Sequence, residues 1–310
     1  MVFVAGIIGS ELAPTKSLST LPVATIVVGT ALSVIPVIRL MSIFGRKKVF
    51  LSACIYSILL IGLCIFSITK EIFFLFSFAS FCLGASVATM MQFRFAAIES
   101  VNLEQRASAT AVVLLGGLIS AFLGTEIATI GKSILETDFA GSFLLLALLF
   151  IIAFVLMIFF EPATKFKEHK DKSKRPLIDI TTQGSFIVAV SAATTGYVVM
   201  SFIMTATPVS MHVMDGHSLH HTKLVLQSHV IAMFLPSLFT AYVVKYIGLT
   251  RMMLIGVLFL FVSVLIAFMS HALTNYWWSL VLLGLGWNFL FIGGTNLLPQ
   301  AYNENEKFKV

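Results

Sequence analysis

The sequence is short of charge. Only 11% of its 310 residues are Asp, Glu, Lys or Arg, whereas an average soluble domain carries about 25%. This shortage excludes a soluble enzyme and a disordered tail. Cysteine is scarce as well, and Cys54, Cys64 and Cys82 all lie inside apolar runs. They are interpreted as small packing residues, which excludes a disulfide-rich secreted module and offers no metal-ligand spacing.

Apolar residues are abundant instead. They make up 58% of the chain, and the mean hydropathy is +1.01. A helix needs roughly 17–25 mostly apolar residues to cross a bilayer, and nine runs meet that length. The runs are continuous, not alternating, so they predict an all-α polytopic membrane protein rather than a barrel. The nine expected full spans are Leu21–Ile38, Val49–Ile68, Ile72–Phe93, Ala107–Ile130, Phe139–Phe160, Gly184–Thr207, Leu224–Val244, Met252–Met269 and Tyr276–Leu298.

A tenth apolar run, Met1–Ser10, is too short to cross. Ten residues of helix reach about 15 Å, half of a hydrocarbon core. We interpret this run as the outer half of a first span whose beginning is missing. It is counted as segment 1, and the full spans are segments 2 to 10.

Basic residues gather on one side of the expected bilayer. Because Lys and Arg are enriched in cytoplasmic loops, that side is expected to face the cytoplasm of a bacterial inner membrane. The net charge of +6 then reflects membrane topology, and no nucleic-acid partner is expected. Sixteen of the 20 basic residues lie on this side: Arg39, Arg46, Lys47, Lys48, Arg94, Arg106, Lys165, Lys167, Lys170, Lys172, Lys174, Arg175, Lys245, Arg251, Lys307 and Lys309.

The longest polar stretch divides the chain. It predicts an N-terminal helical bundle over residues 1–160 (segments 1–6), a basic cytoplasmic linker over residues 161–183, and a C-terminal bundle over residues 184–310 (segments 7–10). The linker is interpreted as a solvated connection. Its Lys and Arg cluster also suits contact with anionic lipid.

The loop between segments 2 and 3 carries RLMSIFGRKKVF, beginning at Arg39. A glycine permits a tight turn there, and the cations suit a helix end beside an anionic leaflet. The loop resembles the cytoplasmic motif of the major facilitator superfamily, Gly-x-x-x-Asp-Arg-x-Gly-Arg-Lys. Gly45, Arg46, Lys47 and Lys48 match it, while Ser42 takes the place of its Asp. A weak repeat supports two related halves, since Gly248 in IGLTRMMLIG follows segment 8 much as Gly45 follows segment 2.

Two further stretches resemble the same superfamily. RFAAIESVNLEQRASA resembles its loop into span five, with Arg94 and Glu99 at one helix end and Arg106 opening the next helix. We expect Arg94 to pair with Glu99 or Glu104. GGLISAFLGTEIA resembles a glycine-rich exporter motif in which Thr125 stands where Pro is usual.

The resemblance implies a secondary transporter of a small solute that works by alternating access. We expect proton coupling, and the glycine-rich motif favours export. Family members have 12 spans, so the chain is expected to be truncated at both ends, and a non-transporting remnant is the alternative function. Motifs of a membrane enzyme, such as His-Glu-x-x-His and Gly-x-Ser-x-Gly, are absent from the sequence, and an enzyme is not expected.

Polar groups at membrane depth are costly and are therefore functional candidates. Glu126 is the strongest, because a carboxyl in a poor dielectric can take up and release a proton. The alternative is a carboxyl hydrogen-bonded near the outer interface. His229 suits either proton exchange or a hydrogen-bonded bridge between helices. The other candidates offer hydroxyl, amide and aromatic groups to a solute, or pack and bond within the bundle: Gln227, Tyr197, Thr194, Trp287, Asn288 and Asn296.

The expected partners are the lipid bilayer, an unidentified small molecule and protons. The loop His212–His221 is rich in histidine but lacks the spacing of a known metal site. No metal and no cofactor are predicted.

Overall fold

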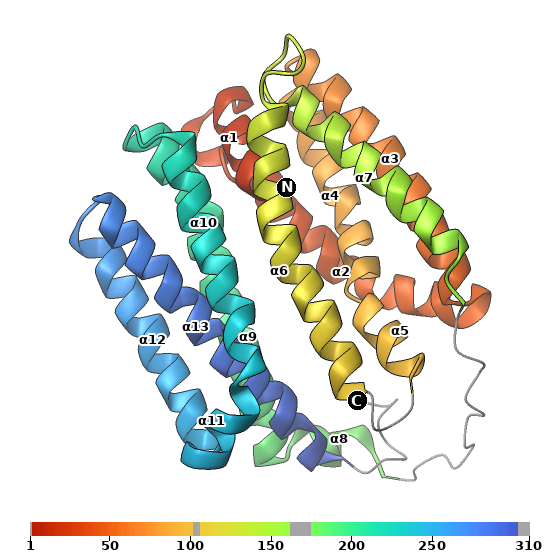
Figure 1. Ribbon diagram of the computed structural model, residues 1–310, viewed down its shortest axis with the longest axis vertical. Helices are drawn as coiled ribbons and strands as arrows, with labels where there is room; N and C mark the ends of the chain where they lie inside the picture. Colours follow the sequence, from red (N-terminus) through yellow and green to blue (C-terminus); the bar gives the residue numbers. More distant parts are fainter. Residues whose placement is uncertain (1, 102–105, 162–174, 303–310) are drawn as a thin grey trace. The chain divides into compact units, whose positions relative to one another are not determined.

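The computed structural model describes residues 2–101, 106–161 and 175–302, and the elements within these ranges are all helical (Figure 1). Contacts divide the chain into two compact units. Unit 1 is formed from Met1–Thr164 together with Thr205–Leu219. Unit 2 is formed from Lys165–Met204 together with His220–Val310.

Seven helical runs in the described part of the chain are long and apolar enough to cross a bilayer. They coincide with seven of the nine expected spans. The expected span Ala107–Ile130 corresponds to α6 (Arg106–Gly131), within which Gly116–Gly131 qualifies as a shorter apolar helix. The described part of the chain is therefore all-α, with helices long and apolar enough to span a membrane, and the count of nine full spans is not confirmed.

A proline interrupts the expected span Leu224–Val244. Helix α10 (Leu219–Phe234) ends at Phe234, a 3-10 turn η4 (Leu235–Leu238) follows, and α11 (Thr240–Ile247) begins after Phe239. Pro236 has no N–H to donate, and its ring clashes with the carbonyl of the preceding turn. The 16 residues of α10 therefore reach about 24 Å before the break.

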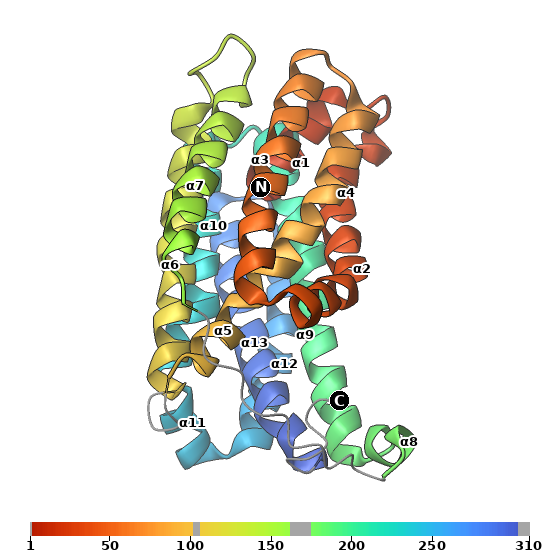
Figure 2. The same cartoon turned by 90° about the vertical axis from the view of Figure 1, so that its right-hand side faces the viewer.

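Unit 1 is built on two closely packed helix pairs. Helix α2 lies against α4, and α3 lies against α7 (Figure 2). Gly84 brings α4 so near α2 that an added Cβ would stand 2.7 Å from the Ile26 carbonyl oxygen. Small residues of this kind let membrane helices approach closely. The elements of the unit are α1 (Val2–Leu12), η1 (Lys16–Leu18), α2 (Leu21–Phe44), α3 (Arg46–Thr69), α4 (Phe73–Met90), α5 (Phe93–Glu99), α6, α7 (Ala140–Ile158) and the π-helical η3 (Val209–Met214).

Unit 2 pairs α12 with α13 along their lengths (Figure 1). Hydroxyls bind the pair together, because Ser263 Oγ donates to the Ser279 carbonyl at 2.8 Å and Ser279 Oγ donates back to the Ser263 carbonyl at 2.9 Å. The elements of the unit are α8 (Leu177–Thr181), α9 (Gly184–Pro208) as far as Met204, α10, η4, α11, α12 (Leu249–Met269), α13 (Leu273–Leu297) and η5 (Leu298–Ala301).

A clasp joins the beginning and the end of unit 2. Arg175 Nη2 and Gln183 Nε2 both donate to the Ala301 carbonyl oxygen, at 3.1 and 2.9 Å. Between these two residues, α8 places Ile180 in a fully buried position. The segment that leads into α9 is thereby fixed to the chain that leaves α13.

Two glycines make the same turn in the two units. Gly45 between α2 and α3 has φ 82° and ψ 155°, and Gly248 between α11 and α12 has φ 81° and ψ 158°. Each donates its N–H to the carbonyl four residues earlier, at 2.9 Å. This part of backbone space is essentially restricted to glycine. The repeat in the sequence therefore corresponds to a repeated turn.

Replacing Gly45 by alanine tests this requirement. No heavy atom lies within 4 Å of an added Cβ, so the cost comes only from the positive φ. We expect Gly45→Ala to lower the free energy of unfolding by about 1–3 kcal/mol, measured by thermal unfolding in detergent micelles. The matched control is Gly62→Ala, within α3 and equally free of neighbours, which should gain about 0.5–1 kcal/mol. Equal effects at the two positions would contradict the backbone explanation.

Candidate functional site

Four aromatic rings meet in unit 2. Trp287 and Phe291 lie one turn apart on α13 and stack with ring centroids 4.9 Å apart and an interplanar angle of 10°. Tyr197 of α9 stands edge-on to both rings at 5.4 Å. Phe234, the last residue of α10, contacts the indole of Trp287 at 6.0 Å. We call Tyr197, Phe234, Trp287 and Phe291 the aromatic cluster.

The cluster has a buried and a more open layer. Trp287 is 4% exposed, whereas Tyr197 and Phe291 are half-buried. No group in the described part of the chain accepts the proton of Trp287 Nε1. A buried indole N–H normally finds an acceptor. This donor is therefore the least satisfied polar group of the cluster.

A polar seam joins α10 to α13 beside the cluster. His229 is fully buried, and its Nδ1 lies 2.7 Å from the Leu280 carbonyl oxygen, so Nδ1 carries the proton and donates. One turn further along α13, Gly284 lets the helices touch, because a Cβ there would stand 2.6 Å from the His229 carbonyl oxygen. Asn288 Nδ2 then donates at 2.6 Å to the carbonyl of Met233 and to Ser237 Oγ.

The polar atoms of the seam are only partly paired. The Met233 carbonyl belongs to the last turn of α10, where backbone acceptors have no partner within the helix. Asn288 provides one. His229 Nε2 and Asn288 Oδ1 have no hydrogen-bond partner among the described residues.

The remaining candidates of unit 2 differ in exposure. Gln227 is buried on α10, while Thr194 on α9 and Asn296 near the end of α13 are exposed. The residue after Gln227, Ser228, accepts the indole proton of Trp277 at 2.9 Å. The structure thus brings together Tyr197 and Trp287, and separately His229 and Asn288 along the seam.

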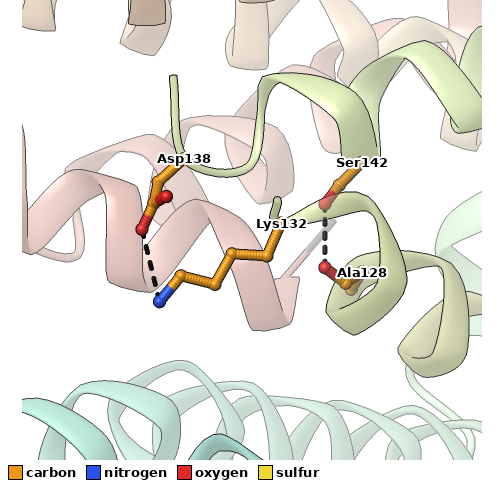
Figure 3. A network of polar contacts seen from close by, with 4 residues as sticks. All are labelled: Ala128, Lys132, Asp138 and Ser142. Atoms are coloured by element: carbon orange, nitrogen blue, oxygen red, sulfur yellow. Dashed lines mark hydrogen bonds and ion pairs between the residues drawn. The ribbon is translucent and has the colours of Figure 1, made fainter. Parts of the chain in front are cut away.

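Glu126 lies in unit 1, five residues before the end of α6. Its side chain is half-buried, and its own carbonyl accepts a hydrogen bond from Thr129 Oγ1 at 3.0 Å. The neighbouring turn is held firmly: Ser142 Oγ donates to the Ala128 carbonyl at 2.8 Å, and Lys132 pairs with Asp138 at 3.3 Å (Figure 3).

A pocket of about 300 Å³ opens at the end of unit 1 that the charge distribution predicts to be external. Three acidic residues, Glu11, Glu71 and Asp138, line it together with Ile8, Leu12, Ile68 and Thr137. Partial burial and the Asp138 carboxylate raise the pKa of Glu11 above its ordinary 4.5, and Lys132 and His212 oppose this rise.

The residues of the loop motif surround the Gly45 turn. Arg39 and Lys48 are exposed, Arg46 and Lys47 are half-buried, and Arg46 Nη1 lies 3.9 Å from Met41 Sδ. The side chains of Arg94, Glu99 and Arg106 lie outside the part that the structure describes, so their expected pairing stays a prediction.

Sequence reasoning missed several residues of these arrangements. Phe291 could have been predicted as a neighbour of Trp287, because it follows Trp287 by four residues and so shares its helical face. The sequence gives no comparable signal for Phe234, Met233 and Ser237, since their role depends on where α10 ends. Gly196 of α9 also escaped notice, although it faces Trp287 directly.

Removing the Asn288 amide should loosen the seam. We expect Asn288→Leu to cost about 1–3 kcal/mol of stability, because the Met233 carbonyl is left buried without its donor. Asn296→Leu serves as the matched control on the same helix; as a surface change it should stay within about 0.5 kcal/mol. Thermal unfolding in detergent measures both variants, and an Asn288→Leu protein as stable as wild type would refute the capping role.

Comparison with known proteins places this arrangement in a family. The family model described as Major Facilitator Superfamily matches residues 1–307. The riboflavin transporter RfnT of Brucella anthropi is 32% identical over 318 residues, which cover 100% of this chain and 78% of that protein. Two uncharacterized MFS-type transporters of Bacillus subtilis, YdeG and YddS, are 32% and 29% identical, cover 97% and 99% of this chain, and match over 74% of their own lengths.

The match extends over both units and over the motifs around Gly45. Together with the membrane-spanning helices, it identifies an integral membrane protein of a transporter family and confirms the prediction made from the loop motifs. The chain belongs to the Major Facilitator Superfamily.

Proposed function

We propose that this chain exports a flavin-like solute across the bacterial inner membrane by alternating access, in exchange for protons. Membership of the superfamily supports a secondary transporter rather than an enzyme. The observation that carries the choice of solute is the relative named as a riboflavin transporter, which aligns with the whole of this chain.

The direction is inferred from α6. Its glycine-rich stretch, with Gly117 and Gly124, resembles the motif of exporters, and export against a gradient requires an energy source such as proton entry. In this proposal the basic linker of residues 161–183 faces the cytoplasm, as the excess of Lys and Arg favours.

Glu126 is the residue that we assign to proton coupling. It is an ionisable side chain on α6, half-buried and five residues from the helix end. A carboxyl can take up and release a proton, and the bound solute can compete with that proton. If the solute and the proton bind in exchange for each other, solute export is coupled to proton entry.

Purified protein in liposomes tests the transport itself. With the membrane potential clamped by potassium and valinomycin, an acidic lumen should drive accumulation of radiolabelled riboflavin. For one-to-one exchange, each pH unit supports about a tenfold concentration ratio. The measurement is the steady-state ratio at several imposed pH differences, with protein-free liposomes as the control.

The sign of the gradient separates the alternatives. Accumulation driven by an acidic exterior would show symport and overturn export by proton exchange. A protein that neither accumulates riboflavin nor exchanges it across the membrane would refute the proposed solute, and the same result with a broad set of solutes would identify a non-transporting remnant.

Neutralising Glu126 tests the coupling. We expect Glu126→Gln to retain solute exchange at equal pH but to lose the accumulation driven by an acidic lumen. The matched control is Glu136→Gln, an exposed carboxyl in the turn after α6, which should behave as wild type. Unchanged gradient-driven accumulation in Glu126→Gln would show that the proton is carried elsewhere.

A further inference from the structure

We infer that Tyr197, Trp287 and Phe291 form a binding subsite for a planar heteroaromatic ring that carries a hydrogen-bond acceptor at its edge. This inference rests on the proposed function, since the ring would belong to the transported solute. It adds the residues that would hold the ring and the group that would select it.

The faces of the cluster suit a flat ligand. Trp287 and Phe291 present nearly parallel rings, and Tyr197 closes their side edge-on. Flat rings associate through offset stacking and through edge-to-face contacts, and both geometries are present here. Because Tyr197 and Phe291 are only half-buried, they provide the open layer on which an incoming ring can pack.

The unsatisfied donor identifies the chemistry of that ring. Trp287 is 4% exposed, and none of the described residues accepts its Nε1 proton. Leaving a buried donor without an acceptor costs free energy, and such groups are rare unless they serve a purpose. A ring carbonyl or ring nitrogen on the solute would satisfy this donor, whereas a purely hydrocarbon ring would not.

Gly196 of α9 packs against the edge of the indole. A Cβ at this position would stand 3.7 Å from Trp287 Cδ1, the carbon bonded to Nε1, and 3.4 Å from Leu290 Cβ. These are ordinary contact distances, so an alanine fits against the helix. In this inference the solute approaches Nε1 along this edge, and a methyl group at position 196 would stand in its way.

The indole protons give a direct test. The chain holds three tryptophans, Trp277, Trp278 and Trp287, so the indole region of a 15N-tryptophan spectrum contains three signals that Trp→Phe variants assign. The probe is lumichrome, a planar tricyclic dione without a sugar-like chain. We expect lumichrome to shift the Trp287 signal downfield, as a new hydrogen bond does, and to leave that of Trp278, which is exposed, in place.

Binding measurements on variants complete the test. Lumichrome fluorescence should give a dissociation constant about tenfold higher for Trp287→Phe, which keeps a stacking ring but loses the donor. Gly196→Ala should weaken binding to a similar degree through the blocked edge. Trp278→Phe, an exposed position on the same helix, is the control and should bind as wild type.

The outcomes decide the inference separately from the transport proposal. Lumichrome binding that leaves the Trp287 signal unmoved, or that is equally tight in a folded Trp287→Phe protein, overturns the subsite. So does a wild-type protein that fails to bind lumichrome. If Trp287→Phe unfolds early in a thermal scan, Gly196→Ala and the indole shift decide instead. Riboflavin transport in liposomes is measured independently, so its presence with any of these negative results would leave the proposed function standing without this subsite.

Discussion

The structure depends on one constraint: hydrocarbon offers no hydrogen bonds, so each polar group within a span must find its partner inside the protein. Hydroxyl groups satisfy this requirement by donating to backbone carbonyls. Ser57 Oγ lies 2.7 Å from the Ala53 carbonyl oxygen and also forms a hydrogen bond with Ser86 Oγ on α4. Ser263 of α12 and Ser279 of α13 satisfy the same requirement through hydrogen bonds between two helices. Such bonds also hold helices together where lipid provides no hydrophobic drive between them.

The exceptions to this rule are unevenly distributed. Four buried side-chain atoms of the described residues lack a partner, and three of them belong to His229, Trp287 and Asn288, all within unit 2. The fourth, Ser80 Oγ, lies in α4 of unit 1. In the subsite inferred above, a solute would complete one of these bonds, that of Trp287 Nε1.

Much of the fold was accessible from the sequence, because the cost of placing a residue in lipid is local and additive. The length of the apolar runs therefore predicted most spans, and the glycine of the loop motif predicted the turn that Gly45 makes. The break at Pro236 was not foreseen, although proline inside a run is a visible warning. Which faces of α9, α10 and α13 meet depends on packing, so the sequence indicates Tyr197 and Trp287 by their chemistry alone and does not indicate Phe234.

Family membership and site geometry support different parts of the function. The alignment over residues 1–307 establishes a transporter family but carries no information on which side chains touch the solute. The proposals about the aromatic cluster and about the carboxyl of Glu126 rest on side-chain chemistry, and the two features lie in different units.

The clasp on the Ala301 carbonyl sets an order of events during synthesis. Arg175 and Gln183 precede Ala301 by 126 and 118 residues, so both donors leave the ribosome long before their acceptor exists. Neither hydrogen bond of the clasp can therefore form until α10 to α13 have been made. Closure of the clasp is thus a late step in the assembly of unit 2.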